Sequence, residues 1–141
     1  MTLDPRHCMC NGLRRTGRAV TQLYDGELRP SGMRATQFSI LGTIHGHGEA
    51  NLALLARELL LDQTTLTRSL RLLETKKWLQ RVPKPDARMK TLALTPAGLA
   101  ALHAAMPLWE KAQRRMLAAL GAEAWAEVEG RLERLAKLAG E

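Results

Sequence analysis

Short polar and cationic side chains recur along residues 63–77 at positions that share one face of a helix. At about 100° per residue, Thr64, Arg68 and Arg71 fall opposite the leucines of the segment. A guanidinium can pair with guanine, a glutamine can read adenine, and a threonine hydroxyl can bind a phosphate or touch a thymine methyl. These side chains therefore predict recognition of double-stranded DNA. The candidate residues on this segment are Gln63, Thr64, Thr65, Thr67, Arg68 and Arg71.

A basic loop follows the segment and offers a second set of DNA-binding side chains. Arg88 stands two residues after Asp86, which can pair with it and restrict its motion. An arginine held on a narrow loop suits the minor groove, where negative potential is concentrated. Lys84 and Lys90 are expected to meet flanking phosphates. The alternative is an ordinary exposed Asp–Arg pair, which contributes little energy.

The elements around these residues are expected to form a helix-turn-helix followed by a β-wing. Asn51 predicts the start of a helix over 52–60, and Asp62 the start of a second over 63–77. Leu66, Leu70 and Leu73 give the second helix a buried stripe. Two strands are expected over 79–82 and 90–95, joined by a loop that two prolines stiffen.

The rest of the chain is predicted to be helical. Helices are expected over 8–28, 36–45, 96–120 and 122–138, with Thr95 as an N-cap and Pro107 as a kink inside the third of them. The apolar stripes of the first and the last two helices exceed what a small winged domain can cover. A homodimer is therefore expected, and the alternative is a monomer that folds these helices back on itself.

Composition and charge agree with a basic globular protein. The chain has 141 residues, 45% of them hydrophobic, and a net charge of +7. Residues 1–95 hold 15 lysines and arginines against 8 acidic residues, whereas residues 96–141 hold 6 of each. This one-sided excess indicates a polyanionic partner, with nucleic acid ahead of an anionic membrane surface. No apolar run is long enough to span a membrane and the first residues lack a signal-like core, so no membrane partner and a cytoplasmic location are expected.

Two segments of the chain resemble the MarR family of transcriptional regulators. The run from Asp86 to Gly98, DARMKTLALTPAG, resembles the family's wing signature, and the run from Gln63 to Leu70, QTTLTRSL, resembles its recognition helix. One departure is Trp78, where the family usually has glycine, which predicts an altered turn between helix and wing. The resemblance implies a mainly α fold with a small β-wing. It also implies a repressor that binds a palindromic operator and is released by a small molecule or by oxidation of a cysteine.

The resemblance also implies one domain that spans residues 1–141. Within it, dimerisation helices are expected over about 8–28 and 96–139, and a winged helix-turn-helix over about 34–95. Arg14, Arg18, His45 and Trp109 are conceivable residues of an effector pocket, although each is also explained as a surface or core residue.

Cys8 and Cys10 allow three interpretations. They are inert residues at a dimer seam, or a redox switch whose thiolate is favoured by a helix N-terminus and nearby arginines, or part of a metal site with His7. Cys10 lies fourteen residues before Tyr24, which resembles the sensing cysteine of the family's organic-hydroperoxide branch. However, Arg14 stands where that branch has a tyrosine, and its second tyrosine is missing. The inert interpretation therefore comes first, redox second and metal third.

Two other function classes compete with a DNA-binding regulator. An enzyme is not expected, because no nucleophile–base pair, glycine-rich phosphate loop or supported metal-ligand spacing occurs, and no cofactor is predicted. A winged-helix module that binds protein is the other alternative, but such a module needs no basic wing tip. A steep decrease of DNA affinity with salt would distinguish the two.

Overall fold

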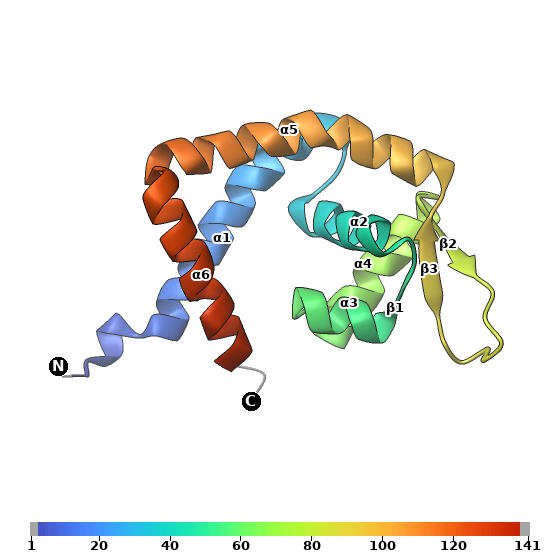
Figure 1. Cartoon of the computed structure of the whole chain (residues 1–141), viewed down its shortest axis with the longest axis horizontal. Helices are drawn as coiled ribbons and strands as arrows, with labels where there is room; N and C mark the ends of the chain where they lie inside the picture. Colours follow the sequence, from blue (N-terminus) through green and yellow to red (C-terminus); the bar gives the residue numbers. More distant parts are fainter. Residues whose placement is uncertain (1–2, 139–141) are drawn as a thin grey trace.

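The computed structural model of the chain describes residues 3–138, so both ends of the expected domain, residues 1–2 and 139–141, lie outside the described residues. The structure is mainly helical with a small antiparallel sheet, as expected (Figure 1). Its elements are η1 (Pro5–His7), α1 (Met9–Leu28), η2 (Arg29–Ser31), α2 (Ala35–His47), β1 (Ala50–Asn51), α3 (Leu52–Leu59), α4 (Gln63–Thr75), β2 (Leu79–Val82), β3 (Thr91–Leu94), α5 (Pro96–Leu120) and α6 (Ala122–Leu138).

Three helices begin at the residues that the sequence predicts as N-caps. The side chains of Asn51 and Asp62 accept from the amides of Leu54 and Thr65, each at 2.8 Å. Thr95 Oγ1 accepts from the Gly98 amide at 2.9 Å. Each bond satisfies a backbone donor that the first turn of a helix leaves unpaired. The positions of α3, α4 and α5 are therefore set by residues directly before them.

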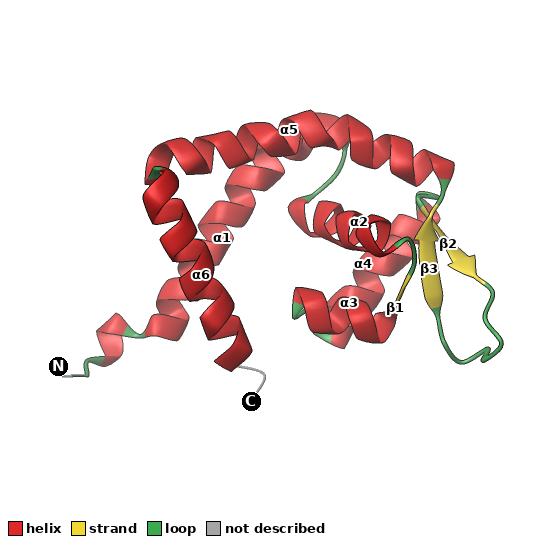
Figure 2. Ribbon diagram, viewed as in Figure 1, coloured by secondary structure: helices red, strands yellow, loops and turns green. Residues whose placement is uncertain are grey.

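The sheet has three strands in the order β1-β3-β2, all antiparallel (Figure 2). Strands β2 and β3 form the wing, with Leu79 opposite Leu94 and Val82 opposite Thr91. Strand β1 is only two residues long and pairs Ala50 with Leu92. The sequence analysis missed it, because two residues are too few to show an alternating pattern. Strand β1 joins the wing to the segment between α2 and α3.

One continuous core lies under α2, α3, α4 and β3. Leu66, Leu70 and Leu73 of α4 are buried, which confirms the predicted stripe. The same core contains two isoleucines and a leucine of α2, Leu55 of α3 and Leu92 of β3, and it extends to Leu28 of α1 and Leu102 of α5. We call residues 35–94, from α2 to β3, the reading head.

Helix α1 contacts α5 through a hydrogen bond and two ion pairs. The Tyr24 hydroxyl donates to the Gln113 side chain, and the Glu27 carboxylate meets Arg115 at 2.7 Å and Lys111 at 3.0 Å. Hydrogen bonds from Arg115 and then Lys111 hold the pKa of the Glu27 carboxyl below its usual value. Asp25, also on α1, accepts from the Ala35 amide at 2.8 Å and so caps the start of α2. Helix α1 therefore contacts both α5 and the reading head.

Helix α5 runs unbroken through Pro107 and connects the reading head to α6. It is drawn as a curved helix in Figure 1, and Trp109 stacks on Phe38 of α2 with ring centroids 5.5 Å apart. Within the described residues, α6 contains no buried side chain. None of the helices in residues 3–138 is long and apolar enough to cross a membrane.

The turn from α4 to β2 differs from the expectation based on Trp78. The residue with a positive φ, the conformation that favours glycine, is Lys77 at 60°. The Trp78 amide donates to the Leu73 carbonyl at 3.0 Å and the Lys77 amide to the Glu74 carbonyl at 2.9 Å, which is a Schellman motif. The turn is therefore a standard helix end whose left-handed residue is Lys77, and Trp78 follows it with its amide hydrogen-bonded.

Candidate nucleic-acid interface

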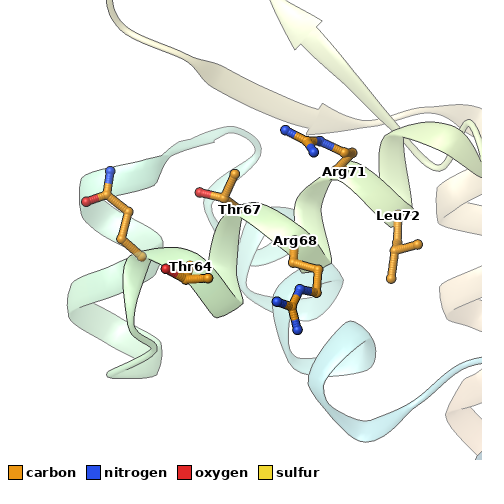
Figure 3. Close-up of a pocket in the computed structure, with 6 residues that line it drawn as sticks. Thr64, Thr67, Arg68, Arg71 and Leu72 are labelled. Atoms are coloured by element: carbon orange, nitrogen blue, oxygen red, sulfur yellow. The ribbon is translucent and has the colours of Figure 1, made fainter.

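The exposed face of α4 brings together five of the six residues predicted on this helix. Gln63, Thr64, Thr67, Arg68 and Arg71 line a shallow, open depression of about 430 Å³, together with Leu72. In Figure 3, the Arg68 and Arg71 side chains leave the exposed face of the helix in different directions. Residues 3–138 contain no ion-pair partner for either guanidinium. Their donors are thus available to an outside acceptor.

Thr65 differs from the other predicted residues, because its side chain is used inside the protein. Its hydroxyl donates to Asp62 Oδ2 at 2.7 Å, while its amide donates to Asp62 Oδ1. These two bonds lower the pKa of the Asp62 carboxyl, which keeps the capping carboxylate charged. Thr65 therefore contributes to the start of α4 and is not directed toward the depression.

Leu72 is a residue of this surface that the sequence analysis did not identify. It is 51% exposed and lies next to Arg68 and Arg71 in the depression (Figure 3). It falls outside the buried stripe of α4, and a leucine on a polar helix face is easily read as a core residue. The helical period does place Leu72 away from Leu70 and Leu73, and this is the signal in the sequence that could have identified it as exposed. A leucine there offers an apolar contact beside two arginines.

The wing loop, residues 83–90, places its cations in two different environments. The Arg88 side chain is 94% exposed, and its Nε lies 3.4 Å from Asp86 Oδ1. The same carboxylate oxygen accepts from the Arg88 amide at 3.0 Å, so Asp86 shapes the loop as well as meeting the guanidinium. Lys84 is paired with Glu49, and Lys90 Nζ lies 2.6 Å from Glu74 Oε1. The expected Asp86–Arg88 pair is present, whereas both lysines already have carboxylate partners.

The junction between the wing and α5 fixes how the wing leaves the reading head. The Thr95 amide donates to the Trp78 carbonyl at 3.0 Å, and Thr95 Oγ1 donates to the Lys77 carbonyl at 2.6 Å. Gly98 lies so close that an added Cβ would be 2.0 Å from the Trp78 carbonyl oxygen. Only glycine fits there, which gives a physical reason for the Leu-Thr-x-x-Gly part of the wing motif.

Lys76 joins α4 to the segment between α1 and α2. Its Nζ donates to the Gly32 carbonyl at 3.1 Å and lies 4.5 Å from the centre of a Trp78 ring. Lys76 therefore stabilises the reading head, although its charge belongs to the same basic stretch as the wing.

The two cysteines lie far from this surface, at the start of α1. Cys8 and Cys10 are free and exposed in the single chain. Tyr24 is about 21 Å further along the helix at 1.5 Å per residue, and its hydroxyl is bonded to Gln113. Among residues 3–138, no three histidine, cysteine or acidic side chains come together as a metal site.

A pocket of about 550 Å³ lies beside the last turns of α1 and the segment that connects α1 to α2. It is lined by Gln22, Asp25, Gly26, Arg29, Gly32, Met33 and Arg34. None of the four residues suggested from the sequence for an effector pocket lies in it. Trp109 instead stacks on Phe38, and His45 packs edge-on against His103. Those two residues belong to the packing between α2 and α5.

Comparisons with known proteins agree with this geometry. Residues 33–88 match the family model described as the MarR family. The structure of the Mycobacterium tuberculosis transcriptional regulator MosR in complex with DNA is similar at a TM-score of 0.86 and 36% identity, over 95% of this chain and 97% of that one. No curated protein matches the sequence.

Two further solved structures are similar over nearly the whole chain. A mutant of MarR from E. coli, complexed with operator DNA, has a TM-score of 0.81 and 26% identity, over 90% of this chain and 92% of that one. A probable transcriptional regulator from Pseudomonas aeruginosa has a TM-score of 0.83 and 25% identity, over 94% of this chain and 99% of that one.

Proposed function

This chain belongs to the MarR family of DNA-binding transcriptional regulators, and we propose that it is a homodimeric repressor released from a palindromic operator by a small molecule. The observation that carries the DNA-binding part is the exposed face of α4, where Arg68 and Arg71 have no acid partner among residues 3–138. A helix of this kind fits the major groove, and a wing beside it reaches the adjacent minor groove or backbone.

We assign separate roles to the two parts of the surface. Arg68 and Arg71 read base edges, and Gln63, Thr64 and Thr67 contact bases or phosphates beside them. Arg88 enters the minor groove, with Asp86 shaping the loop that presents it. Thr65 acts through the Asp62 cap, which keeps the first turn of α4 in place.

Exposed apolar residues on α1, α5 and α6 support the homodimer. Helix α6 has no buried side chain, yet Val128, Leu132 and Leu135 recur on it at helical spacing and are 38%, 48% and 39% exposed. Leu117 and Leu120 of α5 and Leu13 of α1 are also exposed. A second copy of the chain would cover these side chains, and a two-fold dimer presents two reading heads to two half-sites.

The pocket beside the last turns of α1 supports release by a small molecule. Asp25 lines it and also caps α2, so a ligand that moves Asp25 acts directly on the start of the reading head. Two half-sites of a palindrome lie about 34 Å apart, or one helical turn. A change in the separation of the two heads would therefore weaken binding without unfolding either head.

Replacing the wing-tip arginine tests the DNA-binding proposal. The protein is expected to bind a duplex selected from a randomised pool as a two-to-one complex, with an affinity that falls steeply as salt rises. Arg88→Ala is expected to weaken binding about tenfold, because it removes the proposed minor-groove contact. The side chain is 94% exposed, so its removal is not expected to disturb the fold. Fluorescence anisotropy titrations at several salt concentrations measure both quantities.

The control for this measurement is Arg131→Ala on α6, which removes the same charge far from the reading head. It is expected to leave the affinity within about twofold, since the Arg131–Glu127 pair is exposed. Unchanged affinity of Arg88→Ala would remove the proposed role of the wing tip. A protein that selects no duplex at all would favour the protein-binding alternative.

The exposure of Cys8 and Cys10 favours a second candidate, a thiol-based redox sensor of the same fold. A thiolate reduces an organic hydroperoxide to the alcohol and becomes a sulfenic acid, which condenses with the second thiol to a disulfide and water. Cys10 lies in the first turn of α1, so a disulfide to Cys8 would alter the start of that helix.

Mild organic peroxide distinguishes the two candidate triggers. In the redox case, we expect peroxide to release the protein from DNA and added thiol to restore binding, and Cys10→Ser to abolish the response. The same anisotropy assay follows both steps, with untreated Cys10→Ser as the control for DNA affinity. Binding that is indifferent to peroxide would leave the cysteines structural and favour a small-molecule effector.

A further inference from the structure

Both ends of the wing loop are connected to other elements through lysine–carboxylate pairs. Lys90 Nζ donates to Glu74 Oε1 at 2.6 Å, and Glu74 lies in the last turn of α4. Lys84 donates to Glu49, which lies between α2 and β1. The four side chains are between 29% and 42% exposed, so solvent shields both pairs only in part. The wing is thus linked separately to α4 and to the segment after α2.

The two pairs connect the wing loop to different elements. Lys90 directly precedes β3, whose first two residues, Thr91 and Leu92, are buried. Lys84 and Glu49 line a groove of about 300 Å³ together with Thr91. Because one pair leads to α4 and the other to the segment after α2, the two pairs together restrict movement of the loop.

The contrast with Arg88 indicates what these lysines do. Arg88 is almost fully exposed and its contact with Asp86 is long, whereas Lys90 is 29% exposed and its contact with Glu74 is short. A phosphate bound to Lys90 would lie close to the Glu74 carboxylate, because the Lys90 ammonium is only 2.6 Å from it. The negative charges of the phosphate and the carboxylate would repel each other. The charge of Lys90 is therefore already balanced inside the protein, by a residue of the helix that faces DNA.

We propose that Glu74 is a positioning residue for DNA binding, which fixes the wing relative to α4 through Lys90. The pair lets Arg68 on α4 and Arg88 on the wing meet one duplex without a further ordering step. Lys90 then acts through the geometry of the wing and not as a phosphate contact, and Glu49 supports the other end of the loop through Lys84. The inference rests on the DNA-binding function.

Neutral substitutions of the pair test this role with the full chain and a duplex that the wild-type protein selects from a randomised pool. Glu74→Gln is expected to weaken binding about fivefold, because the wing loses its ion pair with α4. Removal of a negative charge near DNA would by itself have strengthened binding, so the two explanations predict opposite results. Lys90→Gln is expected to weaken it by the same factor and to leave the slope of log affinity against log salt unchanged. The double variant is expected to be no weaker than either single variant, because both remove the same contact. Thermal melting of each variant shows whether the fold is retained.

Glu58→Gln is the matched control, because Glu58 lies on α3 of the same reading head and pairs with His47 instead of the wing. It is expected to leave affinity unchanged or to raise it slightly. The charge-swapped variant Glu74→Lys/Lys90→Glu rebuilds the pair and is expected to bind within about twofold of the wild type. Recovery of affinity in this variant would show that the ion pair matters, and not the identity of either side chain.

Three outcomes would overturn the inference. Glu74→Gln binding as tightly as Glu58→Gln would show that electrostatics alone matters at this position. A salt slope that decreases by about 1 in Lys90→Gln would make Lys90 a phosphate contact. Both outcomes leave the DNA-binding function intact, whereas a wild-type protein that selects no duplex would remove that function and the inference together.

Discussion

Arg68→Ala is expected to remove most of the protein's preference for one DNA sequence while leaving its general affinity for DNA largely in place. The Arg68 guanidinium lies on the exposed face of α4 with no acid partner in residues 3–138. A bidentate pair between an arginine and guanine contributes about 1–3 kcal/mol of discrimination, or roughly five- to hundredfold. The quantity to measure is the ratio of affinities for the selected duplex and for a scrambled duplex of the same composition.

Arg57→Ala gives the control for charge. Arg57 lies exposed on α3, in the same reading head but outside α4. Its loss removes one positive charge and is expected to weaken both duplexes equally, so the ratio stays constant. If Arg68→Ala also leaves the ratio unchanged, Arg68 contacts the backbone and sequence is read by other residues of α4.

Gly98→Ala is expected to destabilise the fold more than any surface substitution. The added methyl group would lie 2.0 Å from the Trp78 carbonyl oxygen and 2.8 Å from its carbonyl carbon. Backbone cannot move aside as a flexible side chain does, so α5 must separate from the turn that precedes β2. Overpacking of this kind costs roughly 3 kcal/mol. Urea unfolding followed by circular dichroism measures the change in the free energy of unfolding.

Gly42→Ala is the matched control for Gly98→Ala. Gly42 lies inside α2, and an added Cβ there would have no atom within 4 Å. Because alanine favours a helix over glycine, this variant is expected to be more stable by roughly 0.5–1 kcal/mol. Equal stability of the two variants would mean that the junction between Trp78 and Gly98 relaxes freely.

The sequence predicted best those features that are decided over a few residues. Asp62 and Thr95 were identifiable as caps because each bonds an amide three residues ahead. The buried stripe of α4 follows from the helical period alone. The positive φ of Lys77 in the turn after α4 could not be predicted, because lysine does not favour that conformation.

Contacts between distant residues could not be predicted. Lys84 finds its partner 35 positions away and Lys90 finds its partner 16 positions away, so their sequence neighbours indicate only a basic loop. Leu72 is different, since its exposure follows from the helical period that buries Leu70 and Leu73, although its residue type suggested the core. The predicted residues do lie on the exposed face of α4 and on the wing loop, but the division between exposed cations and paired ones required the structure.

Pro107 is the position at which α5 can bend most easily. Proline has no amide hydrogen, so the carbonyl of His103 lacks its partner within the helix. The 25 residues of α5 span about 37 Å, with Pro107 close to the middle. A change of about 5° at that point would displace the far end by about 2 Å. A modest rearrangement among the helices that are expected to join two subunits can thus be converted, by a small bend of α5 at Pro107, into a shift of about 2 Å at the DNA.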